Sequence, residues 1–270
     1  MRADGVLPAL SFIFYVFFLI SAVYIYGSLV FQISWRETEP SLTPPRGFGW
    51  PEAILAFFFA LLFLAPVLIA PPSQTHQIQT RDLITNALVT MGMLLAVAGF
   101  LRLRRFDLNA LGGFSKIGFF RTVVTGAVLM LAAYPLIFFA DFITQRVVSN
   151  APRKQEIVEL FSGSSTLEQR VVIIILAISI APLVEEFIFR FFLYGVLKRY
   201  FGRSVGVIVS SLLFAAVHAH LPSFGPLFVL GTCFAIAYEW SGSLLVSMTM
   251  HALFNAMTLT ALAFPERFQP

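Results

Sequence analysis

Apolar runs of about 20 residues recur along the whole chain and are separated by short polar breaks. A membrane-spanning helix needs about 20 mostly apolar residues, so each run predicts one span. We predict eight spans, at approximately residues 7–31, 53–70, 83–101, 122–142, 167–197, 204–219, 224–240 and 244–264. The first run is too long for the apolar core of a cleaved signal peptide, and it predicts a retained span.

The breaks between the apolar runs contain residues that are typical of turns. Proline pairs stand at 44–45 and 71–72, and Gly202 and Gly242 interrupt the later runs. The longest polar connection covers residues 143–166, where we expect a short interfacial helix followed by a turn. Pro182 lies inside the fifth run, and we expect it to kink that helix and to leave one backbone carbonyl without a donor.

Composition agrees with a membrane protein. Hydrophobic residues make up 58% of the chain and charged residues 12%, and the mean hydropathy is +0.85. A soluble domain has about 25% charged residues, so lipid must cover much of this surface. Backbone groups in lipid must be satisfied within the segment, and the alternating pattern of an outer-membrane barrel is absent. We therefore predict an all-α fold, a polytopic transmembrane helical bundle.

The charge distribution predicts an orientation. The formal net charge is +4, and the basic residues form short clusters between the apolar runs. No basic stripe on a soluble fold is evident, so we expect the lipid bilayer as a partner and no nucleic acid. The denser basic clusters follow the odd-numbered spans, and the positive-inside rule places these loops in the cytoplasm. The prediction is a multi-pass protein of the plasma (inner) membrane.

Ionisable residues deep inside a span are rare, usually face the interior of the bundle and mark a functional site. Here they occur in three of the predicted spans, together with one amide: Glu185, Glu186, Arg190, His218, His251 and Asn255. At a rise of about 1.5 Å per residue, their depths overlap near the middle of the bilayer. We therefore expect three helices to bring them into one pocket. Glu239 lies near a span end and is expected at the membrane interface.

Helix geometry groups these side chains further. Residues four apart share a helix face, so Glu186 can pair with Arg190, and Phe214 can pack behind His218. Glu185 is turned about 100° from Glu186 around the helix. The two carboxylates therefore need not do the same job.

These residue types suit hydrolysis of an amide bond. A carboxylate and an imidazole can activate a water, while a second imidazole and an amide can stabilise the oxyanion. The same residues leave zinc open as a cofactor, with Glu185, His218 and His251 as ligands, although the HExxH spacing of soluble zinc proteases is absent. A non-enzymatic protein with the same buried acids, a proton-coupled transporter or a bacteriocin-immunity partner, is the alternative. Inverted repeats and paired broken helices are not evident, which favours the protease.

Three motifs resemble one known family. Glu185 to Arg190 fits EExxxR, Phe214 to His218 fits FxxxH, and His251 to Asn255 fits HxxxN. In this order they resemble the CPBP family, which includes type II CAAX prenyl proteases and bacteriocin-processing (ABI) proteins. The resemblance covers roughly residues 167–263. We therefore divide the chain into four generic N-terminal spans (1–150) and a CPBP-like catalytic helical core (151–270).

The resemblance implies an intramembrane endopeptidase that acts on membrane-associated proteins or peptides. It implies that Glu185 is the general base, that His218 helps to activate the water, and that His251 and Asn255 stabilise the oxyanion. Glu186 would hold the site in shape together with its arginine partner. Members of the family have been described both as metalloproteases and as metal-free glutamate proteases. We expect that no cofactor is required, with zinc as the alternative.

Overall fold

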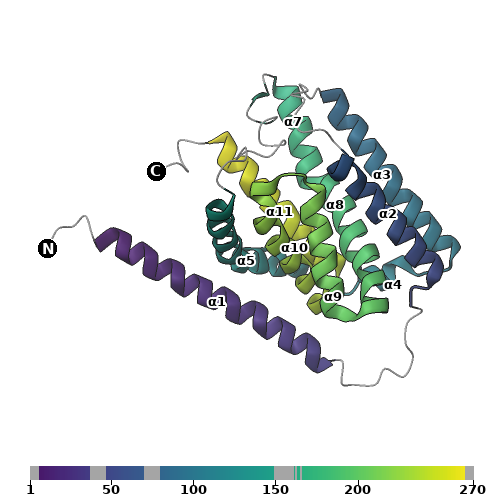
Figure 1. The fold of residues 1–270 in the computed structure, drawn as a ribbon, viewed down its shortest axis with the longest axis horizontal. Helices are drawn as coiled ribbons and strands as arrows, with labels where there is room; N and C mark the ends of the chain where they lie inside the picture. The colour runs from purple at the N-terminus through teal and green to yellow at the C-terminus, as the bar shows by residue number, and fades with distance from the viewer. Residues whose placement is uncertain are drawn as a thin grey trace.

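The computed structural model of the chain describes residues 6–36, 47–69, 80–148, 161, 163–164 and 166–264. Within these ranges the backbone is helical apart from short turns, and it contains no β-strand (Figure 1). The predicted all-α fold is confirmed. The interfacial helix expected in residues 143–166 and the two proline pairs fall mainly on positions outside the described ranges.

The described helices fall into an N-terminal and a C-terminal group along the chain. The N-terminal part contains α1 (Val6–Arg36), α2 (Trp50–Ile69), α3 (Thr80–Leu103), the short α4 (Leu108–Gly112) and α5 (Phe119–Val147). The C-terminal part contains α7 (Leu167–Ile175), the π-helical η2 (Leu176–Ile180), α8 (Ala181–Glu186), the π-helical η3 (Phe187–Leu193), α9 (Tyr194–Val217), α10 (Leu221–Ser241) and α11 (Leu244–Ala263).

Six of the described helical stretches are long and apolar enough to cross a membrane. The stretch Leu167–Val217 counts as one of them, but its backbone turns at Gly202 (φ 82°, ψ 170°), so it holds both the fifth and the sixth predicted span. A positive φ of this size suits glycine. The second predicted span corresponds to α2, whose apolar part Trp50–Ala65 is shorter. Each predicted span therefore falls on a helical segment, and the chain is a multi-pass integral membrane protein.

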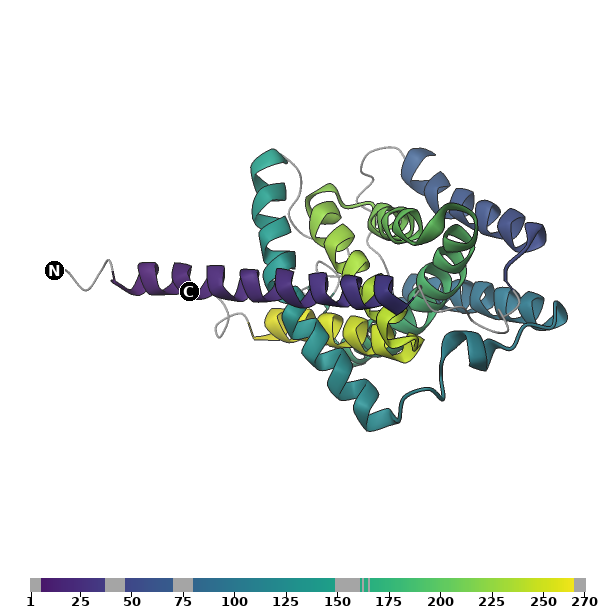
Figure 2. The same cartoon turned by 90° about the horizontal axis from the view of Figure 1, so that it is seen from below.

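The centre of the bundle is formed by α5, α9, α10 and α11, which pack against one another. Helix α1 lies along α5 and α10, while α2 and α3 lie on the side away from α1, against α9 and α8 (Figures 1 and 2). One buried apolar cluster contains Tyr26, Phe59 and Val97 of the first three helices together with Phe192 and Phe234. The N-terminal helices therefore share a single hydrophobic core with the helices that carry the motifs.

The outer faces of the helices are apolar as well. Large hydrophobic side chains stay exposed there, among them Phe12, Tyr24, Leu88, Leu131 and Phe138. Such faces would be costly in water but are expected where lipid covers a helix, because the lipid tails are as apolar as the side chains.

The run from α7 into α9 is continuous, and two π-helical segments interrupt its α-helical register. The N–H of Ala181 bonds to the carbonyl of Leu176, an i→i+5 contact. In this register the donor for the next carbonyl, that of Ala177, would be Pro182, which has no N–H. The free carbonyl expected from Pro182 is therefore the carbonyl of Ala177, and the proline is accommodated by η2.

Candidate active site

A cavity of about 430 Å³ lies among α3, α8, α11 and the end of α9. Its wall includes Glu185, His218, His251 and Asn255, the four residues that the sequence predicts as catalytic. Glu185 belongs to α8, His218 directly follows α9, and the other two belong to α11. The structure therefore brings side chains from three separate motifs to one cavity, whose volume is in the range of ligand pockets.

His251 lies between the two carboxylates of the first motif. Its Nδ1 is 3.0 Å from Oε1 of Glu186, and its Nε2 is 3.9 Å from Oε2 of Glu185. An ionised carboxylate can only accept a hydrogen bond. Nδ1 of His251 therefore carries the hydrogen and donates a hydrogen bond to Glu186. Glu186 thereby fixes the orientation of the ring and directs Nε2 towards Glu185.

Glu186 also pairs with Arg190, as predicted. The Nε atom of Arg190 is 3.3 Å from Oε2 of Glu186, and both side chains are buried. The guanidinium group lies 4.1 Å from the ring centroid of Phe214, and its Nη2 donates to the carbonyl of Gly231 at 3.4 Å. A Cβ atom at Gly231 would come within 3.2 Å of that nitrogen, so the glycine allows this close approach. Removing either member of a buried ion pair is strongly destabilising, because the other charge is then left without compensation.

His218 is held at the C-terminal end of α9. Its Nδ1 is 2.7 Å from the carbonyl oxygen of Phe214, and the two rings pack edge to face with centroids 4.9 Å apart. The predicted packing of Phe214 behind His218 is present. Because a carbonyl only accepts hydrogen bonds, Nδ1 of His218 must donate, and in the neutral ring Nε2 keeps an unused lone pair.

Asn255 takes up the backbone group that the proline leaves without a donor. Its Nδ2 donates to the carbonyl of Ala177 at 2.7 Å, across two helices 78 residues apart in the sequence. A buried carbonyl without a partner is destabilising, so this contact stabilises η2 against α11. The amide carries two N–H groups, and the second is not used by this bond.

Glu185 has an unused acceptor beside the cavity, whereas both oxygens of Glu186 lie next to a basic side chain. Its side chain is 28% exposed, yet its Oε2 atom is buried and has no hydrogen-bond partner among the described residues. Buried polar atoms in proteins normally have a partner, and an exception beside a cavity calls for an explanation. A ligand or water in the cavity would supply the missing donor.

A zinc ion would need Glu185, His218 and His251 to converge on one point. In the part of the chain that the structure describes, no group of three or more His, Cys, Asp or Glu side chains is arranged to hold a metal ion. As arranged here, the residues do not fit a three-ligand zinc centre, and we derive no step through a metal.

Helices of the N-terminal half complete the cavity, which the sequence did not predict. Phe63 of α2 and Leu83, Asn86 and Thr90 of α3 belong to its wall. The only signal in the sequence is that two polar side chains, Asn86 and Thr90, stand one turn apart in an apolar helix.

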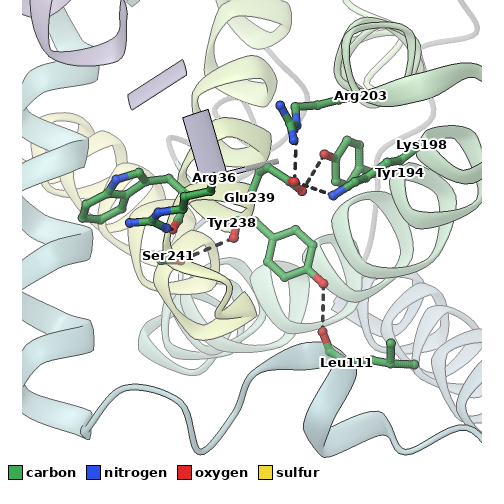
Figure 3. Close-up of polar contacts among 9 residues, drawn as sticks. Arg36, Leu111, Tyr194, Lys198, Arg203, Tyr238, Glu239 and Ser241 are labelled. Carbon is green, nitrogen blue, oxygen red and sulfur yellow. Dashed lines mark hydrogen bonds and ion pairs between the residues drawn. The ribbon is translucent and has the colours of Figure 1, made fainter. Parts of the chain in front are cut away.

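A second polar cluster surrounds Glu239 near the end of α10 (Figure 3). Glu239 accepts a hydrogen bond from the hydroxyl of Tyr194 at 2.7 Å and pairs with Lys198 and with Nε of Arg203, the latter at 3.4 Å. The adjacent Tyr238 donates to the carbonyl of Leu111 at 3.1 Å. These residues are not part of the cavity wall and tie α4 and α9 to α10.

A family profile matches the part of the chain that carries the three motifs. The profile described as type II CAAX prenyl endopeptidase Rce1-like matches residues 167–257. This part of the chain is similar to that family. The matched region begins at the first residue of α7 and contains all three motifs.

Two curated relatives resemble the chain. The membrane-embedded CAAX protease MroQ of Staphylococcus aureus is 26% identical over 136 residues, which cover 48% of this chain and 55% of the relative. The uncharacterized protein YpbD of Bacillus subtilis is 35% identical over 84 residues, which cover 30% of this chain and 40% of the relative. The chain thus matches about half the length of these relatives. No solved structure matches significantly.

Proposed function

We propose that this protein is a membrane-embedded endopeptidase that hydrolyses peptide bonds of membrane-associated proteins or peptides. The observation that carries the proposal is the position of His251 between an orienting carboxylate, Glu186, and a second carboxylate, Glu185, whose buried oxygen is unpartnered beside a cavity. The likeness to a protein named as a membrane-embedded CAAX protease supports the same class.

The separation of Glu185 and His251 suits a shared water. At 3.9 Å, Oε2 and Nε2 are too far apart for a direct hydrogen bond. A water that bonds to both atoms at about 2.8 Å fits between them. Glu185 takes the proton of this water as it attacks the carbonyl carbon of the substrate. The lone pair on Nε2 of His218 gives the cavity a second acceptor for the activated water.

The remaining steps use donors in the same cavity. In this scheme the ring of His251, which lies between two carboxylates, carries a proton on both nitrogens throughout. Its Nε2–H and the unused N–H of Asn255 donate to the oxyanion that forms on the substrate carbonyl. The C–N bond then breaks, and the proton held by Glu185 passes to the leaving amine. Water is consumed, one carboxylate and one amine are formed, and the carboxylate of Glu185 is regenerated.

The test is a comparison of membrane-associated peptides and proteins in cells that lack this chain, cells that carry it, and cells that carry the Glu185→Gln variant. We expect a precursor that accumulates in the first and third strains and is cut in the second. The purified protein should then cut that precursor. Processing by Glu185→Gln at the wild-type rate contradicts the assignment of the base. A changed proton-coupled flux without any accumulating precursor supports a non-enzymatic transporter instead.

Metal dependence is tested separately on the purified protein. We expect cleavage to continue in the presence of a chelator and metal analysis to show no stoichiometric zinc, because an acid and two imidazoles can activate water without a metal. Stoichiometric zinc whose removal abolishes cleavage would make Glu185, His218 and His251 its ligands.

A further inference from the structure

Helix α3 contributes a polar face to the cavity. Asn86 and Thr90 line the same cavity as Glu185, His218, His251 and Asn255, although they come from a helix without any of the three motifs. They lie four residues apart and therefore on one face of α3. Their neighbours in the wall, Leu83 and Ala87, are apolar.

The side chain of Asn86 has unused hydrogen-bonding capacity. Among the described residues no hydrogen bond of its side-chain amide is present, and only its backbone carbonyl is engaged, by the hydroxyl of Thr90 at 3.0 Å. Asn86 lies within the candidate span Arg81–Leu103, and a hydrogen-bond partner there would stabilise its amide. A group that enters the cavity can supply such a partner.

Thr90 offers the complementary chemistry. Its hydroxyl hydrogen is shared between the carbonyls of Asn86 and Ala87, at 3.0 and 3.1 Å. Its oxygen therefore faces a ligand as an acceptor only. Asn86, by contrast, can both donate and accept.

The spacing of the two side chains matches an extended peptide. Residues four apart on a helix are separated by about 6 Å along the axis. In an extended strand, residues two apart present their N–H and C=O groups to the same edge, at a repeat of about 6.6 Å. One edge of an extended peptide can therefore reach Asn86 and, two residues further on, Thr90.

We infer that the Asn86–Thr90 face of α3 binds the backbone of an extended peptide substrate, with the Asn86 amide pairing with one peptide unit and the Thr90 oxygen accepting the N–H two residues away. This inference rests on the proposed function and adds to it the residues that position the scissile bond beside Glu185. Because the contacts involve backbone groups, they fit substrates of differing sequence.

The test uses fluorescein-labelled octapeptides of leucine, alanine and serine, together with a series in which one backbone N–H at a time is replaced by N-methyl. Their dissociation constants are measured by fluorescence anisotropy on the full chain in lipid nanodiscs, in the uncleaving Glu185→Gln background. We compare the Glu185→Gln parent with three proteins that carry one further substitution each: Asn86→Leu, Thr90→Val or, as a control, Thr85→Val. Thr85 is the preceding polar residue of α3 and does not line the cavity.

In the parent protein we expect N-methylation at one position to raise the dissociation constant about three- to tenfold, which is the effect of one lost neutral hydrogen bond. In Asn86→Leu the same N-methyl group should have no further effect. The position two residues away should show the same coupling with Thr90→Val. Thr85→Val should bind every peptide as the parent does.

The outcomes separate this inference from the proposed function. In one outcome the N-methyl effects disappear in the matching α3 variants, but the wild-type protein does not cleave the unmodified peptides. That outcome supports the α3 site and contradicts the protease. If the peptides are cleaved but each N-methyl group has the same effect in all α3 variants, the α3 site is overturned. The α3 site is also overturned if no peptide of the series binds. A merely structural role of Asn86 would change stability but would not couple to one position of the peptide.

Discussion

Two clusters of charged side chains can be compared directly in this protein. The acid–histidine cluster comprises Glu185, Glu186, Arg190 and His251, and the Glu239 cluster comprises Tyr194, Lys198, Arg203 and Glu239. Both contain a carboxylate paired with basic side chains on helices. Pairing alone therefore does not separate a functional site from a structural one.

The clusters differ in whether their hydrogen-bonding capacity is used. Both oxygens of Glu239 have partners, Oε2 the hydroxyl of Tyr194 and Oε1 the two cations. In the acid–histidine cluster, Oε2 of Glu185 is buried without a partner and faces the nitrogen of a fixed imidazole beside a 430 Å³ cavity. A saturated carboxylate stabilises a helix contact, whereas an unsaturated one can act on a substrate. The predictions below test this distinction.

The largest expected effect is on turnover in Glu185→Gln. We expect a loss of about 10²- to 10⁴-fold, the usual contribution of a general base. The melting temperature should stay near that of the wild type, because Oε2 of Glu185 makes no hydrogen bond that the substitution would remove. Initial rates on the precursor and thermal unfolding in detergent check the two statements, and a large fall in the melting temperature would show that Glu185 is structural.

Removing the carboxylate of Glu186 should mainly lower stability. In Glu186→Leu the guanidinium of Arg190 stays buried without its counter-charge, so we expect a loss of about 3–5 kcal/mol in the free energy of unfolding. The double variant Glu186→Leu with Arg190→Met should regain most of this loss, since neither charge of the buried pair is left. It should still be inactive, because His251 has lost the acceptor that orients its ring. Activity of the refolded double variant would exclude the orienting role.

The pair of Asn255 and Pro182 should show coupled stabilities. Asn255→Ala leaves the Ala177 carbonyl without its donor, and we expect a loss of about 1–3 kcal/mol in the free energy of unfolding. Pro182→Ala restores a backbone N–H, so the same Asn255→Ala substitution should be less destabilising in that background. Turnover should fall by about 10²-fold in Asn255→Ala, both alone and combined with Pro182→Ala, as it does when other oxyanion donors are removed. Additive stabilities would contradict the proposed link.

The smallest effect is expected at the Glu239 cluster. Glu239→Gln keeps an oxygen that can accept a hydrogen bond but weakens the pairs with Lys198 and Arg203, whose side chains are 39% and 18% exposed, so we expect about 1 kcal/mol of destabilisation. Turnover should equal that of the wild type, which makes this variant the matched control for Glu185→Gln. A loss of turnover comparable to that of Glu185→Gln would remove the distinction between the two clusters.

The amino-acid sequence by itself determined the helical membrane fold and the residues of the motifs. The length and apolarity of the runs leave only spanning helices for them, because lipid offers no hydrogen bonds to an open backbone. The pairing of Glu186 with Arg190 and the carbonyl freed by Pro182 also follow from local geometry, since they depend on residues a few positions apart in one helix.

Tertiary structure alone decided which distant groups meet. The contact of His251 with Glu186 joins residues 65 apart, and Asn255 reaches the carbonyl of Ala177 over 78 residues. The placement of Asn86 in the cavity and the saturation of Glu239 likewise depend on how whole helices pack. A periodic pattern shows which face of a helix is polar, but not which neighbour that face meets, because the packing of apolar surfaces is non-directional and fixes the partner only when all the helices are in place.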